Sequence, residues 1–318
     1  MMTKAISKVK TIKVIDLFAG IGGIRLGFER VYHGKIESVF SSEWNKYSVQ
    51  TYQANFGMEN VHGDITKVDI SDIPYHDILL AGFPCQPFSQ AGLKKGFEDT
   101  RGTLFFDIAR ILEAKKPKAF LLENVKQLRG HDKGRTLEVI IKTLKEIGYK
   151  NVQYTLLKAR DFGLPQNRER LYIVGFLDDT VPFEFPKPLS VETRVGDVLE
   201  QKVDEKYTIS DRLWAGHQRR KIENRRKGKG FGYSIFTYDS PYTSTISARY
   251  YKDGSEILIA QEGKNPRKVT PKEASRLQGF PEDFKIPVSD TQAYQQFGNS
   301  VPVKVIEAIA KEMLPHLS

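Results

Sequence analysis

The chain has 318 residues, of which 40% are hydrophobic and 28% are charged. This balance is typical of a globular protein and excludes a fibrous or intrinsically disordered one. The length exceeds what one small core needs, so we expect a large domain with a smaller one attached. No apolar run approaches the roughly 18 residues that a membrane-spanning helix needs, and residues 1–10 lack the apolar stretch of a secretory signal. We therefore expect a cytoplasmic protein without a membrane partner.

Basic residues outnumber acidic ones by 49 to 39, which gives a formal net charge of +10. Part of this surplus lies in residues 181–280, which hold 19 basic and 13 acidic residues. Such a surplus favours polyanionic partners, nucleic acids among them. The one cysteine, Cys85, excludes an intramolecular disulfide and a multi-cysteine metal site. It is therefore either an inert core residue or a reactive one.

Short apolar segments recur along the first half of the chain and are separated by amphipathic stretches, such as 103–114 and 135–147, with helical spacing. Strands that alternate with helices predict an α/β fold with a doubly wound, mostly parallel, Rossmann-like sheet. The predicted strands are 10–18, 36–42, 77–81, 118–122, 152–157 and 171–176.

The composition changes near residue 183, where three prolines open a polar, basic and turn-rich region. Helical periodicity returns near residue 269, and residues 303–314 form an amphipathic pattern that could pack back on the first domain. We therefore predict a discontinuous large domain, 1–183 and 269–318, and a smaller domain, 184–268.

The first predicted strand runs into a glycine-rich turn, DLFAGIGG, at residues 16–23. Gly20 and Gly22 would let the backbone approach a ligand closely, beside the free amides of a helix N-terminus. Such a turn alone is more often a matter of packing than of binding. Its meaning depends on the neighbouring strand ends.

Acidic residues follow two further strands. Glu43 and Trp44 end the second strand, and Asp64 with Ile65 stands at another junction between strand and loop. The carboxylates could accept from ribose hydroxyls and an adenine amino group, and the indole could lie against adenine. Either carboxylate alone could be a helix cap. Three such junctions at one sheet edge favour a nucleoside cofactor.

Cys85 lies in LAGFPCQPFS, residues 80–89, directly after a buried strand. The two neighbouring prolines stiffen the backbone, and a thiol on a loop beyond a strand faces a cleft. Reactivity would require nearby positive charge that favours the thiolate. The next strand brings Glu123 to the same edge, and Arg168 and Arg170, two residues apart in an extended segment, would point to one side.

These segments, with ENV at 123–125, QNRER at 166–170, RLQGFP at 276–281 and GNSV at 298–301, follow the motif order of C5-cytosine DNA methyltransferases. The chain resembles the bacterial restriction-modification type over nearly its whole length. It departs at Phe83, where many members carry proline. The resemblance implies an enzyme that methylates double-stranded DNA with S-adenosylmethionine and without a metal. One active site per chain makes a monomer the simplest expectation. A cognate restriction endonuclease, without a stable complex with the chain, is a candidate partner.

The resemblance further implies roles for single residues. Cys85 would attack cytosine C6, and Glu123 would protonate N3 and hold the N4 amino group. Arg170 would contact O2, and Arg168 would bridge the site to the backbone of the loop or DNA. Because C5 is inaccessible in the duplex, the base must be flipped out, with 86–102 closing as a lid. The implied cofactor residues are Phe18, Gly20, Gly22, Glu43, Trp44, Asp64, Ile65, Pro84, Leu104, Asn299 and Ser300, of which Ile65 and Leu104 could be plain core residues, and the implied substrate-binding residues here are Phe83, Gln86 and Ser89.

Residues 217–232 hold seven basic residues among sixteen. Such a run is usually a solvated face, but in the variable target-recognition region it predicts contacts to phosphate or guanine. Residues 243–258 resemble the recognition segment of the Dcm-type group, whose members methylate an inner cytosine of palindromes that begin with CC and end with GG. We expect Arg249 with Tyr250 and Tyr251 to read base edges, or else to pack in the small domain. The further candidates are Arg219, Arg220, Arg225, Arg226 and Lys229.

Three alternatives stay open. A cytosine methyltransferase that acts on transfer RNA would share Cys85, Glu123 and the arginine pair, although a recognition region of about 85 residues favours duplex DNA. A catalytically inactive binding protein would not need the intact motifs. A nicotinamide-dependent oxidoreductase would explain the glycine turn and Glu43, but not Cys85, Glu123 or Arg168.

Overall fold

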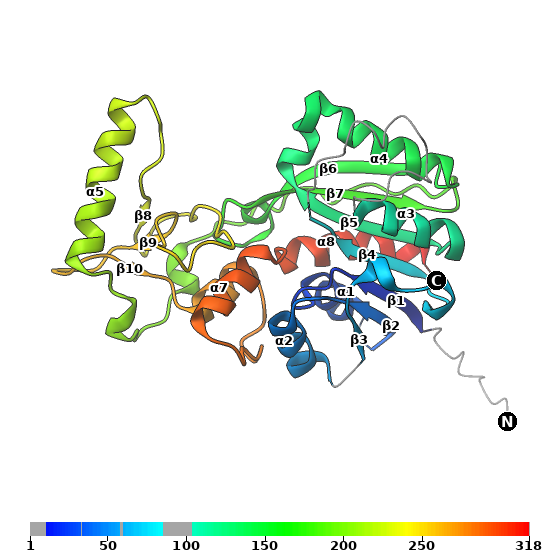
Figure 1. Ribbon diagram of the computed structural model, residues 1–318, viewed down its shortest axis with the longest axis horizontal. Helices are drawn as coiled ribbons and strands as arrows, with labels where there is room; N and C mark the ends of the chain where they lie inside the picture. Colours follow the sequence, from blue (N-terminus) through cyan, green and yellow to red (C-terminus); the bar gives the residue numbers. More distant parts are fainter. Residues whose placement is uncertain (1–10, 33, 58–59, 85–103, 318) are drawn as a thin grey trace.

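The computed structural model describes residues 11–32, 34–57, 60–84 and 104–317 (Figure 1). Its centre is a seven-stranded sheet with the order β3-β2-β1-β4-β5-β7-β6. Only β7 runs antiparallel to its neighbours, β5 and β6, because a short 3₁₀ turn joins β6 directly to β7. The predicted mostly parallel, doubly wound α/β fold is confirmed. The strands are β1 (Ile12–Leu17), β2 (Ile36–Ser42), β3 (Val61–His62), β4 (Ile78–Gly82), β5 (Ala119–Val125), β6 (Asn151–Lys158) and β7 (Glu169–Phe176).

Each face of the sheet carries its own apolar core. In β4, Leu79 and Ala81 belong to the core beneath α3 (Leu104–Lys115) and α4 (Arg135–Glu146). The alternate residues, Ile78 and Leu80, belong to the core beneath α1 (Gly23–Tyr32) and α8 (Val303–Met313). Successive side chains of a strand point to opposite faces, so continuous apolar strands can bury both sides.

The amphipathic segment predicted at 303–314 forms α8 and packs back on the large sheet against α1. Gly27 makes this close approach workable, because a Cβ there would lie 2.5 Å from Ile306 Cγ2. The C-terminal helix therefore completes the core of the first part of the chain.

The second part of the molecule lies beside the large sheet (Figure 1). Its three-stranded sheet has the order β10-β9-β8, and its core joins Ile246 and Tyr250 to Leu277 and Phe297. This core contains residues from both sides of residue 268, so packing shows no break at the second predicted boundary. The division at 183 and 268 stays a prediction.

No helix in the described ranges is long and apolar enough to cross a membrane. The elements are α2 (Lys46–Phe56) in the large part, then α5 (Asp211–Arg226), β8 (Ile235–Phe236), β9 (Leu258–Ile259), β10 (Arg267–Lys268), α6 (Pro271–Leu277) and α7 (Asp290–Asn299).

Candidate active site

Strands β4 and β5 are neighbours in the large sheet and end side by side at one edge. Their parallel register pairs Gly82 with Glu123, so Cys85 follows three residues after the partner of Glu123. Phe83 is buried, and its carbonyl accepts a hydrogen bond from Asn124 Nδ2 at 2.9 Å. Cys85 itself, like Gln86 and Ser89, lies outside the described residues. The described segment ends at Pro84, two residues beyond Gly82, the β4 partner of Glu123.

The Glu123 carboxylate forms an ion pair with Arg170, whose Nε lies 3.2 Å from Oε1. Both side chains are nearly buried, and β7 lies directly beside β5. Burial raises the pKa of Glu123, while the guanidinium groups of Arg170 and Arg168 act in the opposite direction. A buried carboxyl with a raised pKa can hold a proton closer to neutral pH than an exposed one. This is the property that a proton donor at the sheet edge requires.

Arg168 is 1% exposed and connects three parts of the chain. It donates to the carbonyls of Ile246 at 3.1 Å and Gly298 at 2.9 Å, and also to that of Ser300. Burial lowers its pKa to about 9, so the guanidinium remains charged at neutral pH. Arg168 therefore binds the backbone of two other segments, 243–258 and 298–301. The predicted bridge to the loop or to DNA stays a prediction, because residues 86–102 lie outside the described residues.

The glycine turn after β1 adopts a left-handed backbone. Phe18, Gly20 and Gly22 have φ values of 54°, 55° and 81°, of which the first is unusual for a residue with a side chain. Glu43 fixes this turn, because its Oε2 accepts from Gly20 N at 2.8 Å and its Oε1 accepts from Asn45 N at 2.8 Å. Trp44, the next residue, is 83% exposed. The Glu43 carboxylate therefore lies at the glycine turn, and the exposed indole follows it in the chain.

Asp64 caps the short 3₁₀ helix Ile65–Lys67, which is the alternative explanation that its sequence position allowed. Its Oδ1 accepts from the amide of Thr66 at 3.1 Å and from the hydroxyl at 2.8 Å, and these bonds lower its pKa. Ile65 is 2% exposed and belongs to the core, whereas Leu104 is half-buried at the start of α3. Pro84 is exposed at the end of the described segment.

The GNSV segment approaches the glycine turn closely. A Cβ on Gly23 would lie 2.8 Å from Ser300 Oγ, so glycine there admits Ser300 to the start of α1. A Cβ on Gly298 would lie 2.3 Å from Ala248 N, so this glycine admits the recognition segment. Asn299, which lies between Gly298 and Ser300 in the chain, is exposed. The fold brings together segments that are far apart in the sequence.

Sequence reasoning missed a pair of buried glutamines behind the site. Gln166 Oε1 accepts from Ile246 N at 3.1 Å, and its Nε2 lies 3.3 Å from Gln278 Oε1. Gln278 Nε2 in turn donates to Phe297 O at 2.5 Å. Both glutamines are wholly buried. Both glutamines lie in motifs that the sequence analysis quoted, QNRER and RLQGFP, where they are among the polar residues that were given no role; Asn124 in ENV is a third such residue.

The predicted DNA-contacting residues divide into two groups. Arg219, Arg225 and Arg249 are exposed, which leaves them able to meet a polyanion. Tyr250 is wholly buried, and its hydroxyl donates to Ile257 O and accepts from Val269 N. Tyr250 is therefore packed inside the protein, with Val269 and Tyr294 from beyond the predicted small domain among its partners, and base reading by this residue is a wrong prediction. Arg220 is half-buried, and its guanidinium is already engaged by protein, because it pairs with Asp253 at 2.8 Å.

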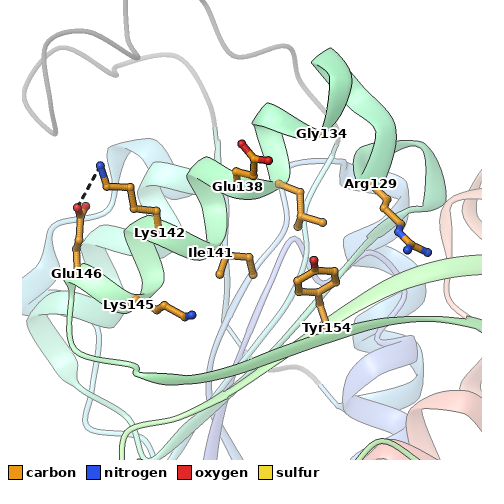
Figure 2. A pocket seen from close by; sticks show the side chains of 9 residues that line it. Arg129, Gly134, Glu138, Ile141, Lys142, Lys145, Glu146 and Tyr154 are labelled. Carbon is orange, nitrogen blue, oxygen red and sulfur yellow. Dashed lines mark ion pairs between the residues drawn. The ribbon is translucent and has the colours of Figure 1, made fainter.

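A surface hollow of about 640 Å³ lies along α4 and is lined by Ile141, Lys145 and Tyr154 among others (Figure 2). None of the predicted site residues that the structure describes lines it. The candidate active site at Glu123 and Arg170 therefore lies outside this hollow. It is identified by the side chains at the strand ends and not by a cavity.

The family model for C-5 cytosine-specific DNA methylase matches residues 12–315. The chain belongs to this family. The chain is 71% identical over 306 residues to the type II methyltransferase M.NlaX of Neisseria lactamica, covering 96% of this chain and 97% of that protein. It is 66% identical to M1.ScrFI of Lactococcus lactis subsp. cremoris, covering 96% and 79%.

Among solved structures, the Dnmt2 methyltransferase of S. pombe covers 96% of the chain with a TM-score of 0.78 and 22% identity, which supports the fold alone. Family membership makes the chain a DNA (cytosine-5)-methyltransferase of the S-adenosylmethionine-dependent kind. This excludes the nicotinamide-dependent oxidoreductase.

Proposed function

We propose that this methyltransferase acts on an inner cytosine of a short duplex palindrome that begins with CC and ends with GG. This methylation protects the DNA from cleavage by a cognate restriction enzyme. The relatives at 71% and 66% identity, both named type II methyltransferases, support the restriction-modification setting. We propose further that the chain acts as a monomer in the cytoplasm, with one active site per chain and no stable complex with that enzyme.

The Glu123–Arg170 pair beside the strand end that leads to Cys85 is the observation that carries the chemistry. The Cys85 thiolate adds to C6 of the flipped base, which breaks its aromaticity and makes C5 nucleophilic. Glu123 holds a proton at N3, which draws electrons from C6, and Arg170 contacts O2. Phe83 offers its carbonyl to the N4 amino group, using the lone pair that Asn124 leaves free. Once C5 has taken the methyl group, transfer of the C5 proton to solvent and elimination of the Cys85 thiolate restore the ring.

S-adenosylmethionine supplies an electrophilic methyl group for C5. The residues at the glycine turn fit this group, because Glu43 presents a carboxylate beside Gly20 and Trp44 presents an exposed indole. We propose that Glu43 accepts from the ribose hydroxyls and that Trp44 lies against the adenine. Asp64 would offer Oδ2 to the adenine amino group, because the bonds from Thr66 go to Oδ1 and the only contact that the described residues make with Oδ2 is an ion pair with Lys67 at 3.8 Å, beyond hydrogen-bond distance. Phe18, Gly22, Ile65, Pro84, Leu104, Asn299 and Ser300 complete the proposed cofactor set.

We propose that Arg249 reads a guanine edge, since it is exposed and arginine pairs with guanine through two hydrogen bonds. It lies beside Ala248, whose backbone meets Gly298. A base reader would thus be attached rigidly to the segment that also holds the proposed cofactor residues Asn299 and Ser300.

The test incubates the protein and C85A with labelled S-adenosylmethionine and either unmethylated duplex DNA or transfer RNA. We expect 5-methylcytosine in DNA with the intact protein only, and bisulfite sequencing to place it at the inner cytosine of a CC…GG palindrome. Label in transfer RNA alone would contradict the proposed substrate. Methylation at an unrelated DNA sequence would contradict only the palindrome.

A further inference from the structure

Helix α5 projects at the end of the molecule remote from the large sheet (Figure 1). Its 16 residues make it about 24 Å long, because an α-helix rises about 1.5 Å per residue. Residues 211–230 hold eight lysines or arginines and two acidic residues. The helix and the turn after it are therefore strongly basic.

One face of α5 packs on the small domain. His217 is buried, and its Nε2 lies 3.2 Å from Asp253 O. Arg220 pairs with Asp253 and donates to Gly232 O at 3.1 Å. Trp214 packs edge-on against Tyr233, with ring centroids 4.9 Å apart. This face is occupied by protein and holds the helix in place.

The opposite face carries Arg212, Arg219 and Arg226. Seven residues complete almost two helical turns, so these three side chains form a stripe with steps of about 10 Å. All three are exposed, and within the described part of the chain no hydrogen bond or ion pair engages them. A cation in the first turn, as at Arg212, is unfavourable to the helix dipole, so its presence does not serve helix stability.

We propose that this outer face of α5 binds the phosphate backbone of duplex DNA outside the target palindrome. The inference rests on the proposed function, a duplex held beside Arg249. Asp253, which anchors Arg220, lies four residues after Arg249, so α5 is fastened to the segment that carries the proposed base reader. A helix of about 24 Å spans roughly seven base pairs, and these contacts to phosphate carry no sequence information.

Duplex binding at varied salt tests this inference with the full chain. The probes are labelled duplexes of random sequence without a CC…GG palindrome, one of about 12 and one of about 30 base pairs. The variant is R212Q/R219Q/R226Q. The matched control, K145Q/K150Q/K311Q, removes the same charge from exposed positions elsewhere.

We expect the slope of log K against log salt to fall by about 2 to 3 in the α5 variant, because each lost phosphate contact removes about 0.9. The α5 variant should also lose the wild-type preference for the duplex of about 30 base pairs. The control variant should keep the wild-type slope and the wild-type preference. An α5 variant that behaves like the control would overturn the inference. So would an unchanged slope combined with a shift from dimer to monomer in sedimentation, since the face would then join two copies. A wrong palindrome would change the bisulfite pattern and leave these slopes untouched.

Discussion

Arg168 donates to the main-chain carbonyl of Ser300, a residue 132 positions further along the chain. The same guanidinium reaches Ile246 and Gly298, so one buried side chain joins the strand that carries Arg170, the recognition segment and the proposed cofactor segment. Arg168 therefore stabilises the fold in addition to any role in the reaction.

Replacing Arg168 by alanine should lower the free energy of unfolding by about 3 to 5 kcal/mol, because three buried carbonyls lose their donor. R168K retains the charge but cannot reach all three carbonyls, so we expect an intermediate loss together with a raised KM for S-adenosylmethionine. Urea unfolding and steady-state kinetics measure both effects. R160Q, at a partly exposed arginine, should stay within about 1 kcal/mol of wild type. Equal losses in R168K and R160Q would contradict the bridging role.

Glu123→Gln should reduce kcat by about 10² to 10⁴, the contribution of a positioned general acid. Its effect on stability should depend on pH. Burial raises the folded pKa of Glu123 above the ordinary 4.5, so between the two values the native state binds more protons than the unfolded one. Stability contributed by this group is complete below pH 4.5 and is lost as the pH rises through the folded pKa.

The glutamine variant lacks this loss. The difference in unfolding free energy between E123Q and wild type should therefore shift in favour of E123Q from pH 4 to pH 8, as measured by urea titrations across that range. A shift in the opposite direction would mean that Arg170 lowers the pKa of Glu123 more than burial raises it.

Asn124→Ala should slow the reaction by about tenfold and destabilise the fold by about 1 to 2 kcal/mol, because Phe83 O loses its donor beside Cys85. N124D is the informative comparison, since its carboxylate can still accept from Val125 N but cannot donate to Phe83. Both variants should lose activity in single-turnover methylation assays. Full activity in N124D would show that the bond to Phe83 is dispensable.

Glu43→Gln should raise the KM for S-adenosylmethionine by about 10- to 100-fold and leave kcat nearly unchanged. One amide oxygen cannot serve Gly20 N, Asn45 N and a ribose hydroxyl as a carboxylate can. E37Q, at an exposed position of the same strand, is the control. Calorimetric titration of the cofactor should show the same weakening. Unchanged affinity in E43Q would remove Glu43 from the cofactor site.

Arg267 and Glu273 form a buried ion pair between β10 and α6 that none of the proposed site residues joins. They form a bidentate pair at 2.7 and 2.8 Å, and Glu273 is wholly buried. R267A should lower the free energy of unfolding by about 3 to 5 kcal/mol, because it leaves a buried carboxylate without its partner. R267A/E273Q should recover part of that loss in the same urea titration. No recovery would indicate that the guanidinium acts mainly by packing.

The sequence by itself predicted six of the seven strands of the large sheet, all but β3, together with the strand ends at Glu43 and Glu123 and the family. These are local properties, because the apolar alternation of a strand and the residues just beyond it are contiguous in the chain. Only the tertiary structure decided which side chains face inward. Tyr250 is buried, Arg220 pairs with Asp253 33 positions away, and Arg168 closes on Ser300. Such choices depend on contacts between distant segments, and no local pattern distinguishes an arginine that binds carbonyls from one that remains free for DNA.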